Sequence, residues 1–282
     1  MKEINVSKII PVVKKLCIDT NYYASEDVVI KIKEFLEKEV SPTGRDILQL
    51  ILENHKMAAE EQMPMCQDTG VAVVFVELGQ DVHLVGGDFY EAINEGVRQG
   101  YIDGYLRKSM VDDPVIERKN TRDNTPAIIY TDIVPGDSLK ITVAAKGGGA
   151  ENMSEVKMMK AADGIEGVKD FVVDRIKRSG GNPCPPVVVG VGIGGSFEQC
   201  ALLAKKSLLR PITEKNPDPV WAAVEEEILE RINKLGIGPQ GLGGRTTALA
   251  VNILQMPCHI ASMPVAVNVN CHCHRHESAV IE

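Results

Sequence analysis

Three cysteines that lie far apart in the sequence constrain the fold more than any other feature. Each is next to an apolar, strand-like run: Cys66 before Val71–Val76, Cys184 before Val187–Val189, and Cys271 after Pro264–Val267. They are separated by 118 and 87 residues, whereas the ligands of zinc knuckles and ribbons come in close pairs. We therefore expect one site that the fold assembles from three distant loops.

The residues around these cysteines point to metal chemistry. Gln67 and Asp68 directly follow Cys66. A thiolate suits iron or zinc, and a carboxylate beside it can exchange protons with whatever the metal holds. Cys184 lies among three prolines, which fix the local backbone and so aim the sulfur. A single cysteine before a strand is often only a small apolar side chain, but three of them favour a shared site.

Composition excludes several classes of function. The chain has 282 residues, enough for one large domain or two modest ones, and a net charge of −8 without a basic stripe, which argues against nucleic acid. No apolar run is long enough to span a membrane, and Met1–Asn5 does not begin a signal peptide. We expect a cytoplasmic protein, in which an odd number of seven cysteines favours metal or catalytic use over disulfides.

Hydrophobic periodicity predicts a mixed α/β fold, with a helical N-terminal layer packed on small mixed or parallel sheets. We expect one domain over residues 1–282, with the helical layer over residues 1–62. The predicted strands are Val71–Val76, Ala127–Ile133, Leu139–Ala145, Val187–Val191 and Pro264–Val269. The later predicted helices are Asp88–Tyr101, Glu151–Met159, Ile165–Ser179, Ser196–Leu209 and Val220–Leu235.

Two glycine-rich segments are candidate binding loops. Lys146–Asn152 follows a predicted strand and opens a predicted helix, so its amides either bind an anion or make a tight turn. Lys146 itself is a weaker candidate, with a solvated lysine as the alternative. Gly190–Gly195 matches G-x-G-x-x-G, but no second strand carries an acid for a ribose. We favour a close backbone approach there over a dinucleotide site.

The segment Cys271–His276 has the composition of a metal-binding tract. In an extended segment, Cys271 and Cys273 share one face and His272 and His274 take the other. We favour surface or interface histidines at 272, 274 and 276. His259 lies 12 residues before Cys271. We expect either a hairpin-like return that brings this histidine close to the cysteine or a buried histidine whose hydrogen bonds are satisfied.

Five motifs together resemble those of the iron–sulfur, or class I, fumarate hydratases and the related L-tartrate dehydratases. In chain order they are Met65–Gly70, Lys146–Gly149, Pro183–Pro186, His259–Ala261 and Asn270–His272. The resemblance covers essentially the whole chain. In single-chain members a second domain continues beyond the point that corresponds to Glu282, so the resemblance implies the alpha subunit of the two-subunit form.

The resemblance implies a 4Fe–4S cluster held by Cys66, Cys184 and Cys271, with Cys273 at a non-ligand position. A cluster with three thiolates leaves one iron open as a Lewis acid for a substrate hydroxyl and carboxylate. The resemblance also implies that Asp68 exchanges a proton with the substrate oxygen, assisted by His259. The substrate contacts that it implies are Gln67, Arg107, Gly148 and Gly149.

The resemblance implies reversible hydration of fumarate to L-malate, a reaction of the tricarboxylic acid cycle, with conversion of L-tartrate to oxaloacetate as the alternative. A small dicarboxylate needs concentrated positive charge, and the motifs offer little beyond Arg107. The family's other cationic residues lie in the second domain, so we expect a beta subunit as partner. A nicotinamide-dependent oxidoreductase based on Gly190–Gly195 and a zinc module based on Cys271–His276 remain distant alternatives.

Overall fold

The structure, a computed structural model, describes residues 2–281, and its packing divides them into two compact units. Within the described chain, unit 1 comprises residues 2–24, 54–148 and 275–281, and unit 2 comprises residues 25–53 and 149–274. The expectation of one domain over residues 1–282 stays a prediction. No helix among the described residues is long and apolar enough to cross a bilayer.

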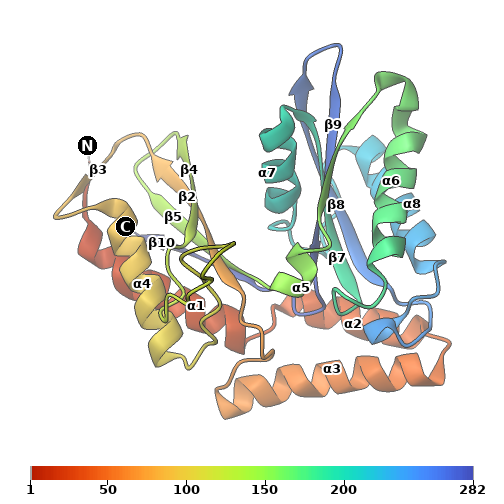
Figure 1. Cartoon of the computed structure of the whole chain (residues 1–282), viewed down its shortest axis with the longest axis horizontal. Coiled ribbons are helices and arrows are strands. Elements are labelled where there is room, and N and C mark those ends of the chain that lie inside the picture. Colours follow the sequence, from red (N-terminus) through yellow and green to blue (C-terminus); the bar gives the residue numbers. More distant parts are fainter. Residues whose placement is uncertain (1, 282) are drawn as a thin grey trace. The chain divides into compact units, whose positions relative to one another are not determined.

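Unit 1 is a four-stranded sheet with two helices packed on one another beside it (Figure 1). In spatial order its strands are β10 (His276–Ile281), β5 (Leu139–Lys146), β2 (Val71–Gly79) and β4 (Ile128–Val134). β5 is antiparallel to both its neighbours, whereas β2 and β4 are parallel. The remaining elements are α1 (Ile9–Tyr22), α4 (Phe89–Asp103) and the parallel pair β1 (Lys2–Asn5) and β3 (Val82–Val85).

The core of unit 1 follows from the alternation of residues along its strands. Ala72, Val74 and Val76 point to one face of β2, where they join alternate residues of β5 and the apolar side chains of α1 and α4 in one cluster. Each fully buried side chain of this kind contributes about 1.5–3 kcal/mol. The sheet is therefore fixed in register, because a shift by one residue would turn this face toward solvent.

Unit 2 is a second four-stranded sheet with helices on both faces (Figure 1). In spatial order its strands are β6 (Glu155–Met159), β9 (Met263–Asn270), β7 (Val187–Gly195) and β8 (Ala248–Cys258). One face packs against α6 (Gly164–Ser179) and α8 (Pro219–Asn233). The other face packs against α7 (Phe197–Ser207), α2 (Glu26–Lys38) and the first part of α3 (Pro42–Glu61).

The mixed α/β fold with its helical N-terminal segment is confirmed, and all five predicted strands are present. One predicted helix, Glu151–Met159, is wrong. The short helix α5 (Gly148–Glu151) ends where that helix was expected to begin, and residues 155–159 form β6. β6 pairs antiparallel with β9, from Glu155 opposite Val267 to Met159 opposite Met263. The pairing partner, far away in the sequence, overrides the local preference.

The Gly190–Gly195 segment lies inside strand β7 and is not a loop. A Cβ atom on Gly190 would lie 2.2 Å from the carbonyl oxygen of Ala204, and one on Gly192 would lie 2.1 Å from that of Cys200. Both carbonyls belong to α7. These glycines therefore let the helix pack directly on the strand, which confirms the close backbone approach expected from the sequence.

Candidate functional site

Strand register brings three distant segments of unit 1 to one end of its sheet. Val71 at the start of β2 lies opposite Lys146 at the end of β5. On the other side of β5, Ala144 lies opposite His276, the first residue of β10. The loop before β2, the turn after β5 and the residue before β10 are therefore neighbours.

Asp68 joins two of these segments through its carboxylate. Its Oδ2 accepts a hydrogen bond from the Gly148 N–H over 2.8 Å, and its Oδ1 accepts one from the Gly70 N–H over 3.0 Å. The side chain is half-buried. A carboxylate held at both oxygens by backbone donors has a fixed orientation. Among the substrate contacts implied by the resemblance, Gly148 is thus brought directly to Asp68.

Two buried residues, Gly70 and Tyr101, hold the backbone of the loop that carries Asp68. Gly70 has φ +71°, and a Cβ atom there would lie 2.5 Å from the carbonyl carbon of Lys146, so only glycine fits. The hydroxyl group of Tyr101 is within 3.0 and 3.1 Å of the carbonyl oxygens of Thr69 and Gly70, to which it donates. Burial raises the pKa of Tyr101, so this hydroxyl keeps its proton and remains a donor.

Asn124 ties the long connection between α4 and β4 to the same loop. It is fully buried, and its Nδ2 donates to the Gly70 carbonyl over 3.1 Å. Its Oδ1 accepts from the backbone N–H groups of Ser109 and Met110, over 2.7 and 3.2 Å. The position of the segment that follows α4 is therefore set by the Asp68 loop.

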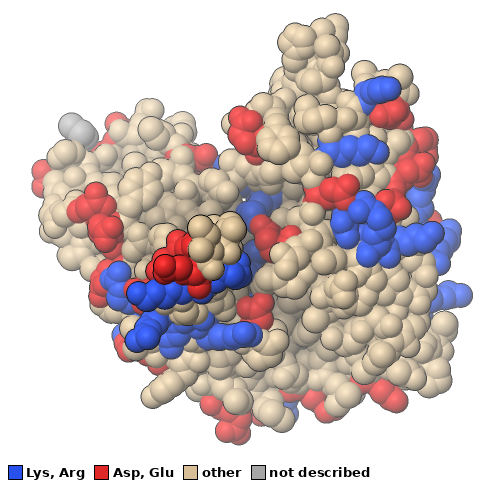
Figure 2. Space-filling model, viewed as in Figure 1, with Lys and Arg blue, Asp and Glu red and all other residues tan. Residues whose placement is uncertain are grey.

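Arg107 lies on this connection and contacts Gln67. Its Nη1 donates to Gln67 Oε1 over 3.0 Å, and its carbonyl oxygen accepts from Thr69 Oγ1 over 3.1 Å. Both Arg107 and Gln67 are exposed. Figure 2 shows Lys and Arg side chains, with Asp and Glu side chains among them, over the region of this connection. Two of the residues implied to bind substrate therefore lie side by side on the surface of unit 1.

Two cations at this end of the sheet are buried: Lys146, a weaker candidate in the sequence, and Arg275, which the sequence did not single out. Lys146 is 5% exposed, which excludes the alternative of a solvated lysine, and Arg275 is 4% exposed. Arg275 Nη1 donates to the buried Asn21 Oδ1 over 2.9 Å. A Cβ atom on Gly147 would lie 3.3 Å from Asp68 Oδ2 and 3.4 Å from Arg275 Nη2. The Asp68 carboxylate and the Arg275 guanidinium thus face the same small space above Gly147.

In unit 2, two of the three predicted metal ligands, Cys184 and Cys271, lie on loops that are joined by a backbone hydrogen bond. The His272 N–H donates to the Cys184 carbonyl oxygen over 3.3 Å, and Cys271 precedes that donor at the end of β9. Cys184 is exposed and has φ +55°, a left-handed conformation that is unfavourable for cysteine. Gly149 lies near the same loop, because a Cβ atom there would be 3.3 Å from the Asn182 carbonyl oxygen. Cys66, the third predicted ligand, is half-buried in unit 1.

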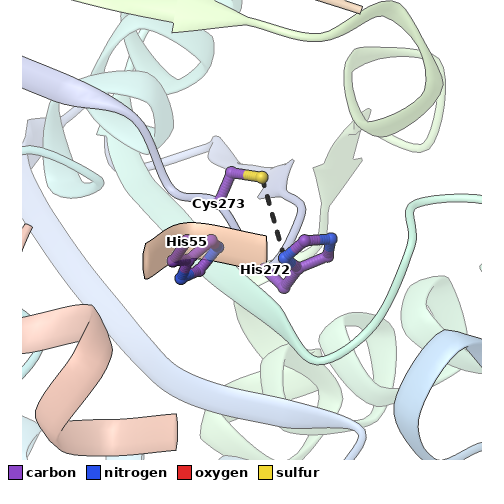
Figure 3. Close-up of side chains that lie close together, drawn as sticks. All are labelled: His55, His272 and Cys273. Carbon is purple, nitrogen blue, oxygen red and sulfur yellow. Dashed lines mark hydrogen bonds between the residues drawn. The ribbon is translucent and has the colours of Figure 1, made fainter. Parts of the chain in front are cut away.

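The Cys271–His276 tract differs from its expected form. Residues 271–275 form a turn with a hydrogen bond from the His274 N–H to the Cys271 carbonyl, so the side chains do not alternate between two faces. His274 is buried, not on the surface. Figure 3 shows His272 Nδ1 and Cys273 Sγ, which are 3.6 Å apart; His55 of α3, also drawn, is 4% exposed.

His259 is not brought near Cys271 within the chain. It lies in the turn between β8 and β9, exposed, with Nδ1 accepting from the Ala261 N–H over 3.1 Å. The eight residues of β9 separate it from Cys271, a distance of about 26 Å at 3.3 Å per residue. No charged residue occurs between Arg245 and Arg275, and Figure 2 shows the tip of this hairpin, at the top of unit 2, without charged side chains.

Glu39 is a buried carboxylate in unit 2 that the sequence did not single out. It is 2% exposed and accepts hydrogen bonds from the backbone N–H groups of Val40, Ser41, Arg245 and Thr246, over 2.7–3.0 Å. Burial alone raises the pKa of this carboxyl group, but the N–H groups of Ser41, Arg245 and Thr246 outweigh it and lower the pKa to about 2. Glu39 is therefore ionised in the folded chain at any ordinary pH.

The low pKa of Glu39 predicts an acid-dependent loss of stability. A carboxyl group with a lower pKa in the folded state stabilises the fold above its unfolded pKa, and the contribution disappears as the pH falls toward the folded value. Relative to the wild type, Glu39→Gln should lower the free energy of unfolding by about 3 kcal/mol at pH 7. Urea unfolding from pH 7 to pH 3 should show this difference shrinking below about pH 4. A difference that does not change with pH would contradict the assignment.

Comparison with known proteins gives consistent matches over almost the whole chain. A family model described as "Fumarate hydratase (Fumerase)" matches residues 10–280. A protein of Methanocaldococcus jannaschii named "Putative L(+)-tartrate dehydratase subunit alpha" is 44% identical over 264 residues, which cover 92% of this chain and 93% of that protein. L(+)-tartrate dehydratase subunit alpha of Escherichia coli O157:H7 is 35% identical over 283 residues, 99% of this chain and 93% of its own. The protein of the same name from strain K12 is 33% identical, with the same coverage.

Proposed function

The chain belongs to the fumarate hydratase family of hydro-lyases, and from this premise we propose that it is the alpha subunit of a 4Fe–4S enzyme that removes water from a hydroxydicarboxylate. The observation that carries the proposal is the Asp68 carboxylate, held by Gly70 and Gly148 at the sheet end where Arg275 is buried. A proton-transferring group and a buried cation in one place suit an anionic substrate.

The donor set fits an iron–sulfur cluster. The proposed ligands Cys66, Cys184 and Cys271 are all thiols, the ligand type that such clusters use. Cys184 and Cys271 lie on loops that are connected by the His272 N–H, and Cys184 is exposed. When bound, a cluster with three protein thiolates supplies an open, Lewis-acidic iron for the hydroxyl group that leaves the substrate.

The residues of this chain have separate roles in the proposed reaction. Asp68 delivers a proton to the hydroxyl oxygen that leaves as water and takes it back in the reverse direction. Arg107 and Gln67, paired on the surface beside Asp68, bind a substrate carboxylate, since a guanidinium group recognises carboxylates through two N–H donors. Gly148 and Gly149, which the resemblance implies as substrate contacts, we assign to the turn after β5, where the Gly148 N–H holds Asp68. We assign His259 to the substrate as well, although Cys271 of its own chain is a strand length away.

L-tartrate is the substrate that we propose, with oxaloacetate as the product. The support is the printed name of the relatives, which are tartrate dehydratase alpha subunits at 33–44% identity. This reverses the order suggested by the motifs, which placed fumarate and L-malate first. Fumarate hydration remains the second candidate, because the matching family model is described by that activity.

We also propose a beta subunit as partner. The relatives are named as alpha subunits. The described chain offers Arg107, Lys146 and Arg275 as cations at this end of its unit 1 sheet, and we assign the further positive charge that a dicarboxylate needs to the partner. Removal of water also needs a group that takes the proton from carbon, which we assign to the partner. The chain alone should therefore be inactive.

The test is an anaerobic assay of this chain, alone and with its beta subunit, on L-tartrate and on L-malate. We expect oxaloacetate from L-tartrate only when both subunits are present, at a kcat/KM at least about tenfold above that for L-malate, a difference of about 1.4 kcal/mol in transition-state binding. Preferential turnover of L-malate would establish the second candidate. Full activity of the chain without a partner would overturn the subunit assignment.

A further inference from the structure

Residues 238–247, here named the clasp loop, contact the chain next to Cys184. The backbone N–H and the side-chain Nε2 of Gln240 both donate to the Pro185 carbonyl oxygen, over 2.8 and 2.9 Å. Pro185 directly follows Cys184. One carbonyl group with two donors from the same residue is firmly fixed, so the Pro185–Pro186 peptide, one residue after the cysteine, cannot rotate freely.

The clasp loop makes two further contacts with the cysteine segment. The Val187 N–H donates to the Thr247 carbonyl oxygen over 2.9 Å. A Cβ atom on Gly181 would lie 3.3 Å from the Cα atom of Gly241, and the Gly181 carbonyl accepts from the Cys184 N–H over 3.1 Å. The clasp loop thus holds residues 181–187 at their beginning, at Pro185 and at their end.

Such support is needed because Cys184 adopts a strained conformation. Its φ of +55° lies in the left-handed region, which costs a residue other than glycine free energy and persists only where the surroundings impose it. The conformation decides where the Cα–Cβ bond points, and so where the sulfur lies. Any residue that fixes the clasp loop therefore acts on the direction of this thiol.

Glu39 is the residue that fixes the clasp loop. Its two carboxylate oxygens accept from the N–H groups of Arg245 and Thr246, at the C-terminal end of the loop, over 2.7–3.0 Å. The two ends of the loop are also bonded to each other, because the Gly238 N–H donates to Thr247 Oγ1 over 3.1 Å. Both α2, which ends just before Glu39, and the clasp loop belong to unit 2.

We propose that Glu39 and Gln240 are positioning residues for Cys184: the Glu39 carboxylate anchors the clasp loop, and Gln240 passes that anchor to the Pro185 carbonyl group, directly after the cysteine. The inference rests on the proposed function, in which Cys184 is a cluster ligand. Both residues act through the backbone next to Cys184, and neither is a proposed cluster ligand or substrate contact. Their role is to keep one thiolate aimed so that the cluster is retained.

Hydrogen–deuterium exchange of the full chain tests the clasp without reference to activity. We compare wild type with Glu39→Gln and Gln240→Asn; asparagine is too short to reach Pro185 but tolerates the positive φ of 53° at that position. The amides of Cys184 and Val187 should exchange about tenfold faster or more in both variants, while β9 stays protected. Because Gln240→Asn removes only one side-chain hydrogen bond, it carries the test where Glu39→Gln fails to fold.

Glu225→Gln is the matched control. Glu225 is also a buried carboxylate of unit 2, but it binds Arg210, Asn216 and the Ile253 N–H, away from the clasp loop. Equal acceleration at Cys184 in this control would show general loosening and overturn the proposal. So would unchanged exchange at Cys184 in folded Glu39→Gln and Gln240→Asn.

Cluster retention gives the second readout. After anaerobic reconstitution, iron loss to a chelator, followed by visible absorbance, should be about tenfold faster in Glu39→Gln and Gln240→Asn than in Glu225→Gln. Equal rates would overturn the role of the clasp in cluster retention. Retention of four irons by Cys184→Ser would instead remove the ligand role from the proposed function, and the exchange experiment would still decide whether the clasp holds the Cys184 backbone.

Discussion

Serine in place of Cys66, Cys184 or Cys271 should in each case abolish the proposed iron–sulfur cluster. Anaerobically reconstituted wild type should contain about four irons and four sulfides per chain, as a three-thiolate 4Fe–4S cluster requires. Each substitution replaces a soft thiolate by a poorly ionised hydroxyl group, so the iron content should fall to a small fraction of this value. Iron and sulfide analysis with EPR of the reduced protein measures the loss.

Two other cysteines supply matched controls for this series. Cys273 is two residues from Cys271 and fully buried, whereas Cys258 is exposed near the tip of the β8–β9 hairpin. Cys273→Ser and Cys258→Ser should keep the full cluster. Equal loss in Cys273→Ser would move the ligand assignment within the turn after β9. Zinc in place of iron and sulfide in the wild type would contradict the hydro-lyase mechanism and favour a zinc module.

The sequence predicted those parts of the site that depend on local pattern. Asp68 and Gly148 each flank an apolar run, one before β2 and one after β5. Runs of this kind are recognisable as strands from composition alone, and their ends are natural places for functional residues. What the sequence did not contain is the antiparallel register that sets Val71 opposite Lys146 and so makes the two residues meet.

The residues that were missed owe their position to long-range pairing. Arg275 precedes β10, a short edge strand of mixed polarity that carries no clear period. The pairing of β10 with β5 places Arg275 at this end of the sheet, where it is buried. Glu39 lies at the end of an amphipathic helix, and its local sequence predicts a solvated acid. Its four N–H donors include two from residues more than 200 positions away. Burial of a charge against backbone donors leaves no signal in local sequence.

Errors in secondary structure have the same origin. Residues 151–159 contain good helix formers, but β9 offers them an exposed edge to pair with, and β6 results. The expected return of His259 toward Cys271 assumed that the chain turns back between them. Instead, β9 runs straight from one to the other, since it is paired with β7 along Val265–Asn270. Whether a segment turns or extends was decided by neighbouring strands in the sheet, not by its own residues.

Asp68→Asn should remove turnover while leaving the cluster and the fold in place. In the assembled enzyme, loss of a positioned proton donor and acceptor should lower kcat by about 10²–10⁴-fold. Asparagine is nearly isosteric and keeps one carbonyl oxygen for either Gly70 or Gly148, but its NH₂ group then faces the other N–H donor. A modest loss of stability, about 1–3 kcal/mol, should accompany the loss of rate.

Two comparisons separate proton transfer from positioning. Asp137→Asn, on the exposed turn between β4 and β5, changes the net charge equally and should leave kcat unchanged. Gly147→Ala keeps the carboxylate but adds a methyl group 3.3 Å from Asp68 Oδ2 and 3.4 Å from Arg275 Nη2. Tight contacts of this kind displace the carboxylate by a few tenths of an ångström, so kcat should fall less than in Asp68→Asn. Steady-state kinetics with matched cluster content measures all three. If Asp68→Asn retained wild-type kcat, the proton would have to pass through another group, and the arrangement of Gly70 and Gly148 around this carboxylate would be a structural support only.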